Sequence, residues 1–139
     1  MLSIGEMSRR TGVKVPTIRY YELTGLLAAP DRTDGNQRRY EPAALERLHF
    51  IRHCRDLGFA LEAVRDLLDL GQDPDQPCHE ADAIARAHLA DVRARIARLQ
   101  RLEAELQRIS TACAHGAVGD CAVIQSLSDH DLCETEHWV

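Results

Sequence analysis

The fold is decided by residues 78–121, which read CHEADAIARAHLADVRARIARLQRLEAELQRISTACAHGAVGDC. From Asp82 to Thr111 this stretch contains neither Gly nor Pro, and it is rich in Ala, Leu, Arg, Glu and Gln, which all favour helix. We therefore predict one continuous helix. A helix of about 33 residues is roughly 50 Å long. Because Cys78 and Cys113 lie at its opposite ends, they cannot meet within one chain.

Apolar residues recur along this helix at three- and four-residue steps, with one small slip in phase: Leu89, Val92, Ile96, Leu99, Leu102, Leu106, Ile109 and Cys113. Such spacing is typical of a coiled-coil face, and an exposed seam of this length needs a partner. If two copies pair antiparallel, Cys78 of one chain lies beside Cys113 and Cys121 of the other. A two-fold axis then makes two identical three-thiolate clusters. The alternative is a helical hairpin with scattered core cysteines.

The charge of the chain is divided unevenly along its length. The total is −5, yet residues 1–55 carry ten basic and six acidic side chains, whereas residues 56–139 carry seven and sixteen. A basic front half indicates a polyanionic partner, and nucleic acid is the first candidate. Ordinary variation in surface charge is the alternative explanation.

The cysteine count and the hydropathy bear on the compartment. We expect a cytoplasmic protein, because no signal peptide and no apolar run long enough to span a membrane is present. Five cysteines, an odd number, then favour metal ligands or reactive thiols over a disulfide framework.

We do not expect an enzyme, because no nucleophile–base pair and no glycine-rich phosphate loop stands out.

A helix-turn-helix is predicted at the N-terminus. Ser3 and Glu6 fit a capping box at the start of a short helix that ends at Gly12. Pro16 suits the first turn of a second helix, residues 15–23. Ile18 should face the core, and the outward-facing residues should reach phosphates and base edges: Lys14, Thr17, Arg19 and Tyr20.

A basic hairpin should follow, because Asp34-Gly35 is a strong turn signal. Arginines flank the turn and an aromatic residue lies beside them, as in a DNA-binding wing. The candidate DNA contacts here are Arg32, Asn36, Arg38, Arg39 and Tyr40. The alternative is a solvated hairpin with surface arginines.

Two more helices should complete the N-terminal domain, residues 1–71. They are expected at about 42–57 and 60–70, with buried stripes at Leu45, Leu48, Ile51 and Cys54, and at Leu61, Val64, Leu67 and Leu68. The polar, proline-containing residues 72–77 read as a linker to a dimerisation helix. The remainder should be that helix (78–112), a metal-binding loop (113–121), and a short helix with a polar tail (122–139).

Together these motifs resemble the MerR family of bacterial transcriptional regulators over nearly the whole chain, weakening after about Ser128. The resemblance is carried by Ile4-Gly5-Glu6, Thr17-Ile18-Arg19-Tyr20-Tyr21-Glu22, Gly25-Leu26-Leu27, Gly35-Asn36, Arg38-Arg39-Tyr40 and the run from Leu48 to Arg55. Within the family, Cys78 with Cys113 and Cys121 resembles the branch that senses cadmium, lead or zinc.

The resemblance implies a mainly α fold, in which a winged helix-turn-helix precedes an antiparallel coiled-coil helix and a C-terminal metal loop. It implies a homodimer on promoters whose two polymerase-recognition elements are spaced too far apart. The apo dimer would repress. Metal would make it bend and untwist the DNA so that RNA polymerase reads both elements, which requires the metal to favour the distorting state. The controlled genes would serve metal efflux or resistance.

The chemistry of the candidate ligands limits which metal ions can bind. Thiolates select copper(I), zinc, cadmium, lead or mercury over magnesium and calcium. As the family is known, its monovalent sensors carry Ser where this chain has Cys78, and a third thiolate favours a divalent ion. Zinc would need a fourth ligand, from His79, His115 or water, whereas lead and cadmium can bind three sulfurs. Cys133 resembles the additional tail cysteines of lead-sensing members, and Ala114 departs from zinc sensors with adjacent cysteines.

As the metal that the protein senses, we expect cadmium or lead first, then zinc, then mercury, with copper(I) last. A copper(I)-type sensor of the same family is one alternative. Another is a metal-buffering protein whose DNA-binding half is vestigial, which a promoter gel shift would distinguish. A redox sensor is disfavoured because the family's redox branch packs four cysteines into the loop, where this chain has two.

Overall fold

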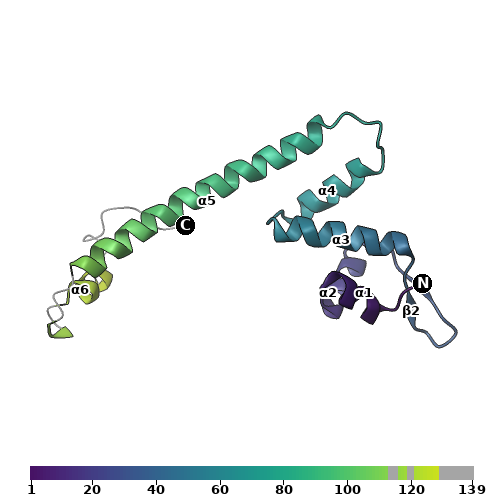
Figure 1. The fold of residues 1–139 in the computed structure, drawn as a ribbon, viewed down its shortest axis with the longest axis horizontal. Helices are drawn as coiled ribbons and strands as arrows, with labels where there is room; N and C mark the ends of the chain where they lie inside the picture. The colour runs from purple at the N-terminus through teal and green to yellow at the C-terminus, as the bar shows by residue number, and fades with distance from the viewer. Residues whose placement is uncertain (113–115, 119–120, 129–139) are drawn as a thin grey trace. The chain divides into compact units, whose positions relative to one another are not determined.

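The computed structural model describes residues 1–112, 116–118 and 121–128 of the chain (Figure 1). The chain divides into two compact units, Met1–Asp82 and Ala83–Val139. The first unit holds the four helices α1 to α4 and the hairpin, and the second holds most of the long helix α5 and the short helix α6. In the ranges that the structure describes, no helix combines the length and apolar composition that a membrane span requires.

Helices α1 (Ile4–Thr11) and α2 (Val15–Leu23) form the predicted helix-turn-helix. The Ser3 hydroxyl accepts from the backbone N–H of Glu6 at 3.1 Å, and it also donates to the Glu6 carboxylate at 3.4 Å. Helix α1 ends at Gly12, whose φ of 75° lies in the left-handed region that glycine adopts without strain. Ile18 is fully buried, as predicted.

The hairpin consists of β1 (Asp31–Arg32) and β2 (Arg38–Arg39), paired antiparallel. The predicted turn is present, but its left-handed residue is Asn36, with φ 62°, rather than Gly35. The Thr33 N–H donates to the Gln37 carbonyl at 2.9 Å, so residues 34–36 form a three-residue loop, within which the Asn36 N–H donates to the Thr33 carbonyl at 2.8 Å. Asn tolerates this conformation better than other residues with a side chain.

Helices α3 (Pro42–Asp56) and α4 (Leu61–Gly71) pack on the helix-turn-helix around one core. The predicted stripes are largely confirmed: Leu48, Ile51, Cys54, Val64 and Leu68 are buried, and Leu45, Leu61 and Leu67 are partly buried against them. The remaining core residues are Met7, Val13, Ile18, Tyr21, Leu26, Leu27 and Tyr40.

Three arginines of α3 and α4 also hold backbone carbonyls at the turns of the helix-turn-helix. Arg47 Nε donates to the Leu26 carbonyl at 2.6 Å, and Arg65 Nη2 donates to the Thr24 carbonyl at 2.6 Å. Arg52 Nη1 donates to the carbonyl of Thr11 at the end of α1. Because helix ends leave carbonyls without intrahelical partners, these charged donors satisfy groups that would otherwise be exposed or orphaned.

Helix α5 (His79–Thr111) runs without interruption, and it begins one residue after and ends one residue before the expected bounds, 78–112. The predicted seam is present but is not covered within the chain. Leu89, Ile96, Leu99 and Leu106 are all about half exposed or more, and Leu106 reaches 62%. A single chain therefore leaves an apolar stripe facing solvent along most of this helix.

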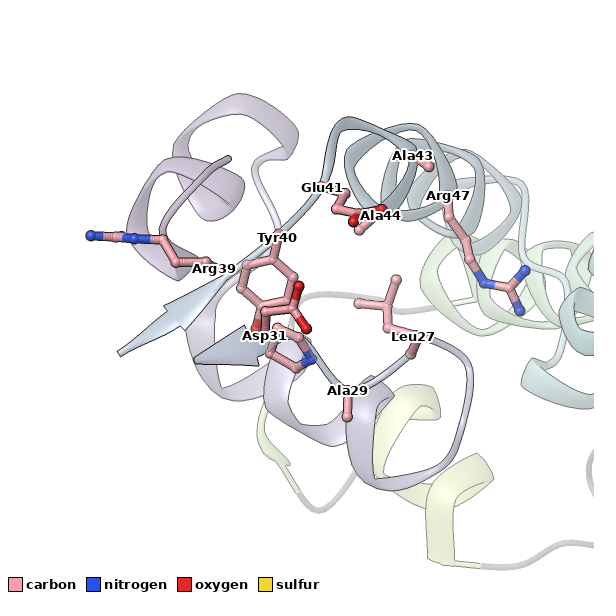
Figure 2. A pocket seen from close by; sticks show the side chains of 11 residues that line it. Leu27, Ala29, Asp31, Arg39, Tyr40, Glu41, Ala43, Ala44 and Arg47 are labelled. Carbon is pink, nitrogen blue, oxygen red and sulfur yellow. The ribbon is translucent and has the colours of Figure 1, made fainter. Parts of the chain in front are cut away.

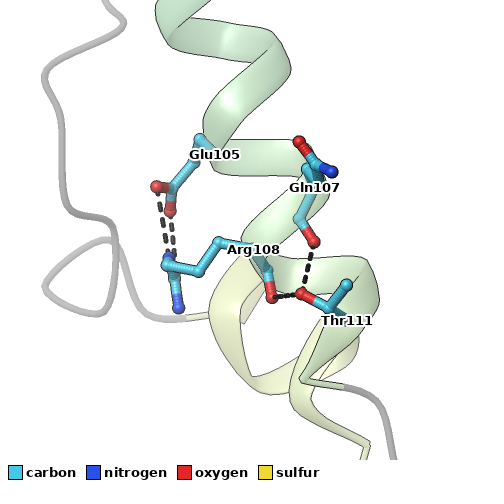
Figure 3. Close-up of polar contacts among 4 residues, drawn as sticks. All are labelled: Glu105, Gln107, Arg108 and Thr111. Atoms are coloured by element: carbon cyan, nitrogen blue, oxygen red, sulfur yellow. Dashed lines mark hydrogen bonds and ion pairs between the residues drawn. The ribbon is translucent and has the colours of Figure 1, made fainter.

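The last turns of α5 are fixed by local polar contacts (Figure 3). Arg108 donates twice to the Glu105 carboxylate, at 2.6 and 3.3 Å, and this carboxylate is buried. The Thr111 hydroxyl donates to the Gln107 carbonyl at 2.7 Å. Helix α6 (Ala122–Ser128) confirms the short helix predicted beyond Cys121.

Candidate functional site

Helix α2 presents the predicted DNA-contacting residues on its outer side. Arg19 and Tyr20 are exposed, and Tyr20 keeps half of its surface open to solvent. Lys14 precedes the helix at its N-cap and is exposed, whereas Thr17 is half-buried. An exposed arginine and tyrosine on this short helix, with an exposed lysine at its N-cap, supply the donors that phosphate oxygens require.

The hairpin carries the second group of predicted contacts. Arg32 and Asn36 are exposed, and Arg32 Nη1 donates to the Asn36 carbonyl at 3.2 Å, across the loop. Arg39 is half-buried and donates to the Gln37 side chain at 3.4 Å. Arg38 is the most constrained, because its Nε donates to Glu22 Oε2 at 3.2 Å.

Tyr40 does not join this surface, and its predicted role as a DNA contact needs correction. Its side chain is only 1% exposed, and its hydroxyl donates to Glu22 Oε1. The reason lies in the backbone: Tyr40 exchanges both N–H···O bonds with Leu2, each at 2.8 Å, which ties the end of the hairpin to the start of the chain. The ring is therefore part of the core beneath the wing.

A pocket of about 320 Å³ opens at the base of the hairpin, between the segment after α2 and the start of α3 (Figure 2). Acidic and basic side chains share its wall: Asp31, Glu41, Arg39 and Arg47. Because the charges balance, the pocket lacks the bias expected of an anion or cation site.

Cys78 lies directly before the first residue of α5, and its carbonyl accepts from the Asp82 N–H at 2.9 Å. Its thiol side chain is exposed, as is His79 beside it. An apolar cavity of about 330 Å³ adjoins Cys78 and is lined chiefly by Phe50, Leu67, Leu70, Pro74 and Pro77. An exposed thiol at the edge of an apolar cavity is accessible to a metal ion, and the apolar wall lowers the polarity on one side of that ion.

Cys121 lies directly before α6, so both candidate ligand cysteines that the structure describes lie at helix starts. It is half-buried, and its carbonyl accepts from the Gln125 N–H at 3.0 Å. Cys113, His115 and Cys133 fall outside the described residues. Cys54 is a core residue, as predicted, and burial raises the pKa of its thiol.

Among the residues that the structure describes, no three cysteine, histidine or carboxylate side chains gather into a metal site within one chain. The 33 residues of α5 follow Cys78 before the loop region begins. At 1.5 Å per residue, such a helix is about 50 Å long.

Sequence reasoning missed Glu22, which binds the wing from the last turn of α2, and the three arginines that hold turn carbonyls. Each pairs with a residue 16 to 41 positions away. No local spacing marks such pairs.

Comparison with known proteins gives two family matches. Residues 2–70 match the MerR HTH family regulatory protein family, and residues 45–109 match the MerR, DNA binding family. The two matches overlap and together cover the N-terminal unit and most of α5.

Individual relatives match over most of their length. The HTH-type transcriptional regulator ZntR of Escherichia coli (strain K12) is 42% identical over 131 residues, which cover 91% of this chain and 92% of that protein. The mercuric resistance operon regulatory protein of Pseudomonas fluorescens is 40% identical, covering 91% and 87%. The crystal structure of PbrR691 from Ralstonia metallidurans CH34 in complex with lead(II) is 38% identical, with a TM-score of 0.79, and covers 91% of this chain and 99% of that one.

These relatives are transcriptional regulators, and the helix-turn-helix, the wing and the long helix of this chain follow the same architecture. The chain therefore belongs to the MerR family, among its DNA-binding regulators that respond to metal ions.

Proposed function

We propose that this protein binds promoter DNA as an antiparallel dimer and senses a divalent soft metal ion at two sites, each shared between the subunits. Each site would take Cys78 from one chain and Cys113 with Cys121 from the other. The N-terminal units would bind the two halves of the operator, and the metal would set their relative position.

The observation that carries this proposal is the separation of Cys78 from the loop cysteines. Both described ligands are positioned at helix starts, and the continuous helix α5 lies between them. Because a helix of this length is about 50 Å long, Cys78 cannot share a metal ion with the loop cysteines of its own chain. An antiparallel partner brings opposite ends together, so a three-sulfur site becomes available in the dimer.

The exposed seam of α5 supports the same arrangement. Leu89, Ile96, Leu99 and Leu106 leave an apolar stripe that a second α5 would cover, and the three- and four-residue spacing is suited to knobs-into-holes packing. Burial of such a stripe is favourable by about 25 cal/mol for each Å² of apolar surface removed from water.

Three thiolates favour a divalent ion that accepts sulfur-rich coordination. Lead(II) and cadmium(II) can use the three sulfurs alone, and zinc(II) would add His79, His115 or water as a fourth ligand. The lead(II) bound by the related PbrR691 agrees with this order. Mercury(II) follows, and Cys133 is a candidate additional ligand.

On DNA, the exposed residues of α2 would enter the major groove, and the hairpin would contact the flanking backbone. The metal-free dimer would hold the promoter in a poorly transcribed form. Metal binding would favour a state that bends and untwists the DNA, so that RNA polymerase engages both promoter elements. Genes for metal efflux or resistance are the expected targets.

The test uses the full-length reduced protein, promoter DNA and a reporter. Cys78→Ser should lose the response to cadmium, lead and zinc, while its affinity for the promoter stays within about twofold of wild type. Cys54→Ala serves as the matched control, because this buried thiol should not affect the response. A Cys78→Ser variant that still responds fully to all three metals would contradict the ligand assignment, and a wild type that binds metal but no promoter would favour a metal-buffering protein.

A further inference from the structure

One carboxylate joins α2, the expected recognition helix, to the hairpin of β1 and β2, the expected wing. Glu22, in the last turn of α2, accepts from Arg38 Nε at 3.2 Å with one oxygen and from the Tyr40 hydroxyl with the other. The Glu22 side chain is only 11% exposed, and that of Arg38 is 23% exposed. A mostly buried carboxylate with both oxygens bonded is held firmly in one orientation.

This contact uses only part of the arginine. A guanidinium is planar and carries five donors in a fixed fork, so fixing Nε also fixes the direction of both terminal nitrogens. Among the described residues, none accepts a hydrogen bond from the terminal nitrogens of Arg38. They remain available on the edges of the guanidinium that Glu22 does not occupy.

The charge of Glu22 would by itself oppose DNA binding. A carboxylate between a recognition helix and a wing repels phosphate groups, so removing it should strengthen DNA binding if charge alone mattered. A carboxylate that instead orders a phosphate-binding arginine has the opposite effect, because it removes the entropy cost of ordering that side chain on binding.

We propose that Glu22 is a positioning residue for DNA binding, whose carboxylate aims the terminal nitrogens of Arg38 at a phosphate and holds the wing against the recognition helix. The inference deepens the proposed function, since it rests on DNA binding by α2 and the hairpin. Glu22 itself need not touch DNA.

The substitution Glu22→Gln removes the negative charge from this contact. A glutamine keeps one oxygen, so its amide can accept from Arg38 Nε or from the Tyr40 hydroxyl, but not from both. The contact to Arg38 is then either lost or reduced to one hydrogen bond without an ion pair, so it holds the guanidinium less firmly. The fold should survive, and unfolding by heat checks this. Asp31→Asn is the matched charge control. Asp31 is exposed on the same hairpin, so this substitution removes the same charge without altering a contact of Arg38.

The experiment measures affinity for a fluorescent duplex that the wild-type protein has selected from a random pool, at one fixed salt concentration. Glu22→Gln should weaken binding by roughly three- to tenfold, the scale of one charge-assisted contact, whereas Asp31→Asn should leave it equal or slightly tighter. In an Arg38→Gln background the effect of Glu22→Gln should change sign, because only the charge repulsion is then removed.

The salt dependence gives a second measurement that a purely structural role would not change. Loss of one phosphate contact lowers the slope of log affinity against log salt by about 0.9. Glu22→Gln and Arg38→Gln should each show this reduction, and the double variant should show it only once.

An equal or tighter affinity for Glu22→Gln would overturn the inference. So would a loss of the same size in both Arg38 backgrounds, since that result would indicate a general structural role. These outcomes concern variants of a protein that binds DNA. Failure of the wild type to select any duplex would instead overturn DNA binding, the proposed function itself.

Discussion

Arg65 Nη2 lies 2.6 Å from the carbonyl oxygen of Thr24, and this bond joins α4 to the C-terminal end of the recognition helix. Thr24 is the C-cap of α2, and Gly25 follows it with a φ of 81°. Because α4 leads into residues 72–77 and then to Cys78, the helix that precedes the candidate metal ligand in the chain also touches the helix expected to read DNA.

Arg65→Gln should lower the free energy of unfolding of the protein by about 1–2 kcal/mol, because a half-buried charged donor is lost from an otherwise orphaned carbonyl. Urea denaturation of the full chain measures this. Arg55→Gln is the matched control. Exposed Arg55 donates, within the described ranges, to the carbonyl of nearby Phe59, so its loss should cost less stability. Equal losses for the two variants would contradict the assigned role of Arg65.

Tyr40→Phe should lower the stability of the protein by about 1–2 kcal/mol through loss of the hydroxyl bond to Glu22. Burial, and then the hydrogen bond and charge of Glu22, raise the pKa of Tyr40 above its ordinary value of 10.0. Because the pKa of Tyr40 is raised in the folded state, the stabilisation that its hydroxyl gives the folded protein is complete below pH 10 and is lost as the pH rises further. The stability gap between wild type and Tyr40→Phe should therefore narrow above pH 10. A gap that is constant or widens there would contradict this account.

Gly12→Ala should be strongly destabilising, by about 1–3 kcal/mol, for two reasons that act together. Gly12 has a φ of 75°, and a Cβ atom there would collide with the Arg52 guanidinium that donates to the Thr11 carbonyl. Gly71→Ala is the control, because no heavy atom lies within 4 Å of its added Cβ and it ends a helix in ordinary backbone geometry. Thermal unfolding should show a large drop for the first variant and little change or a gain for the second.

Leu99→Glu should dissociate the proposed dimer without unfolding the N-terminal unit. Leu99 is 59% exposed in the single chain, so the charge costs little there, but it would be buried in a paired seam. Sedimentation measures the molecular mass, with Gln100→Glu as a neighbouring control outside the seam. A dimer that persists in Leu99→Glu would place the interface elsewhere.

The helices were predictable because each carries a local signal. The capping box at Ser3, the proline in the first turn of α2 and the seam of α5 all depend on spacing within a few residues, and the structure confirms them. The exposure of the seam also follows from its length, since one amphipathic helix cannot cover its own apolar face.

The prediction for Tyr40 failed because it also used only the neighbouring residues in the sequence. An aromatic residue beside two arginines resembles a DNA contact, but its orientation is set by a backbone bridge to Leu2, which lies 38 positions earlier. Glu22 with Arg38, and Arg65 with Thr24, likewise depend on tertiary packing. The ligand set involving Cys113, His115 and Cys133 lies outside the described residues and stays a prediction.

The central claim, a metal site shared between subunits, is tested most directly by mixing two inactive variants. Homodimers of Cys78→Ser and homodimers of Cys121→Ser should each lose the three-sulfur site. In a mixed dimer, Cys78 of one chain meets the intact loop cysteines of the other, so one complete site is restored. Unfolding and refolding the two variants together, followed by titration with cadmium or lead and measurement of thiolate absorbance, should recover tight binding at one site per mixed dimer. Mixtures that bind no better than either variant alone would show that each chain builds its own site, and would contradict the account.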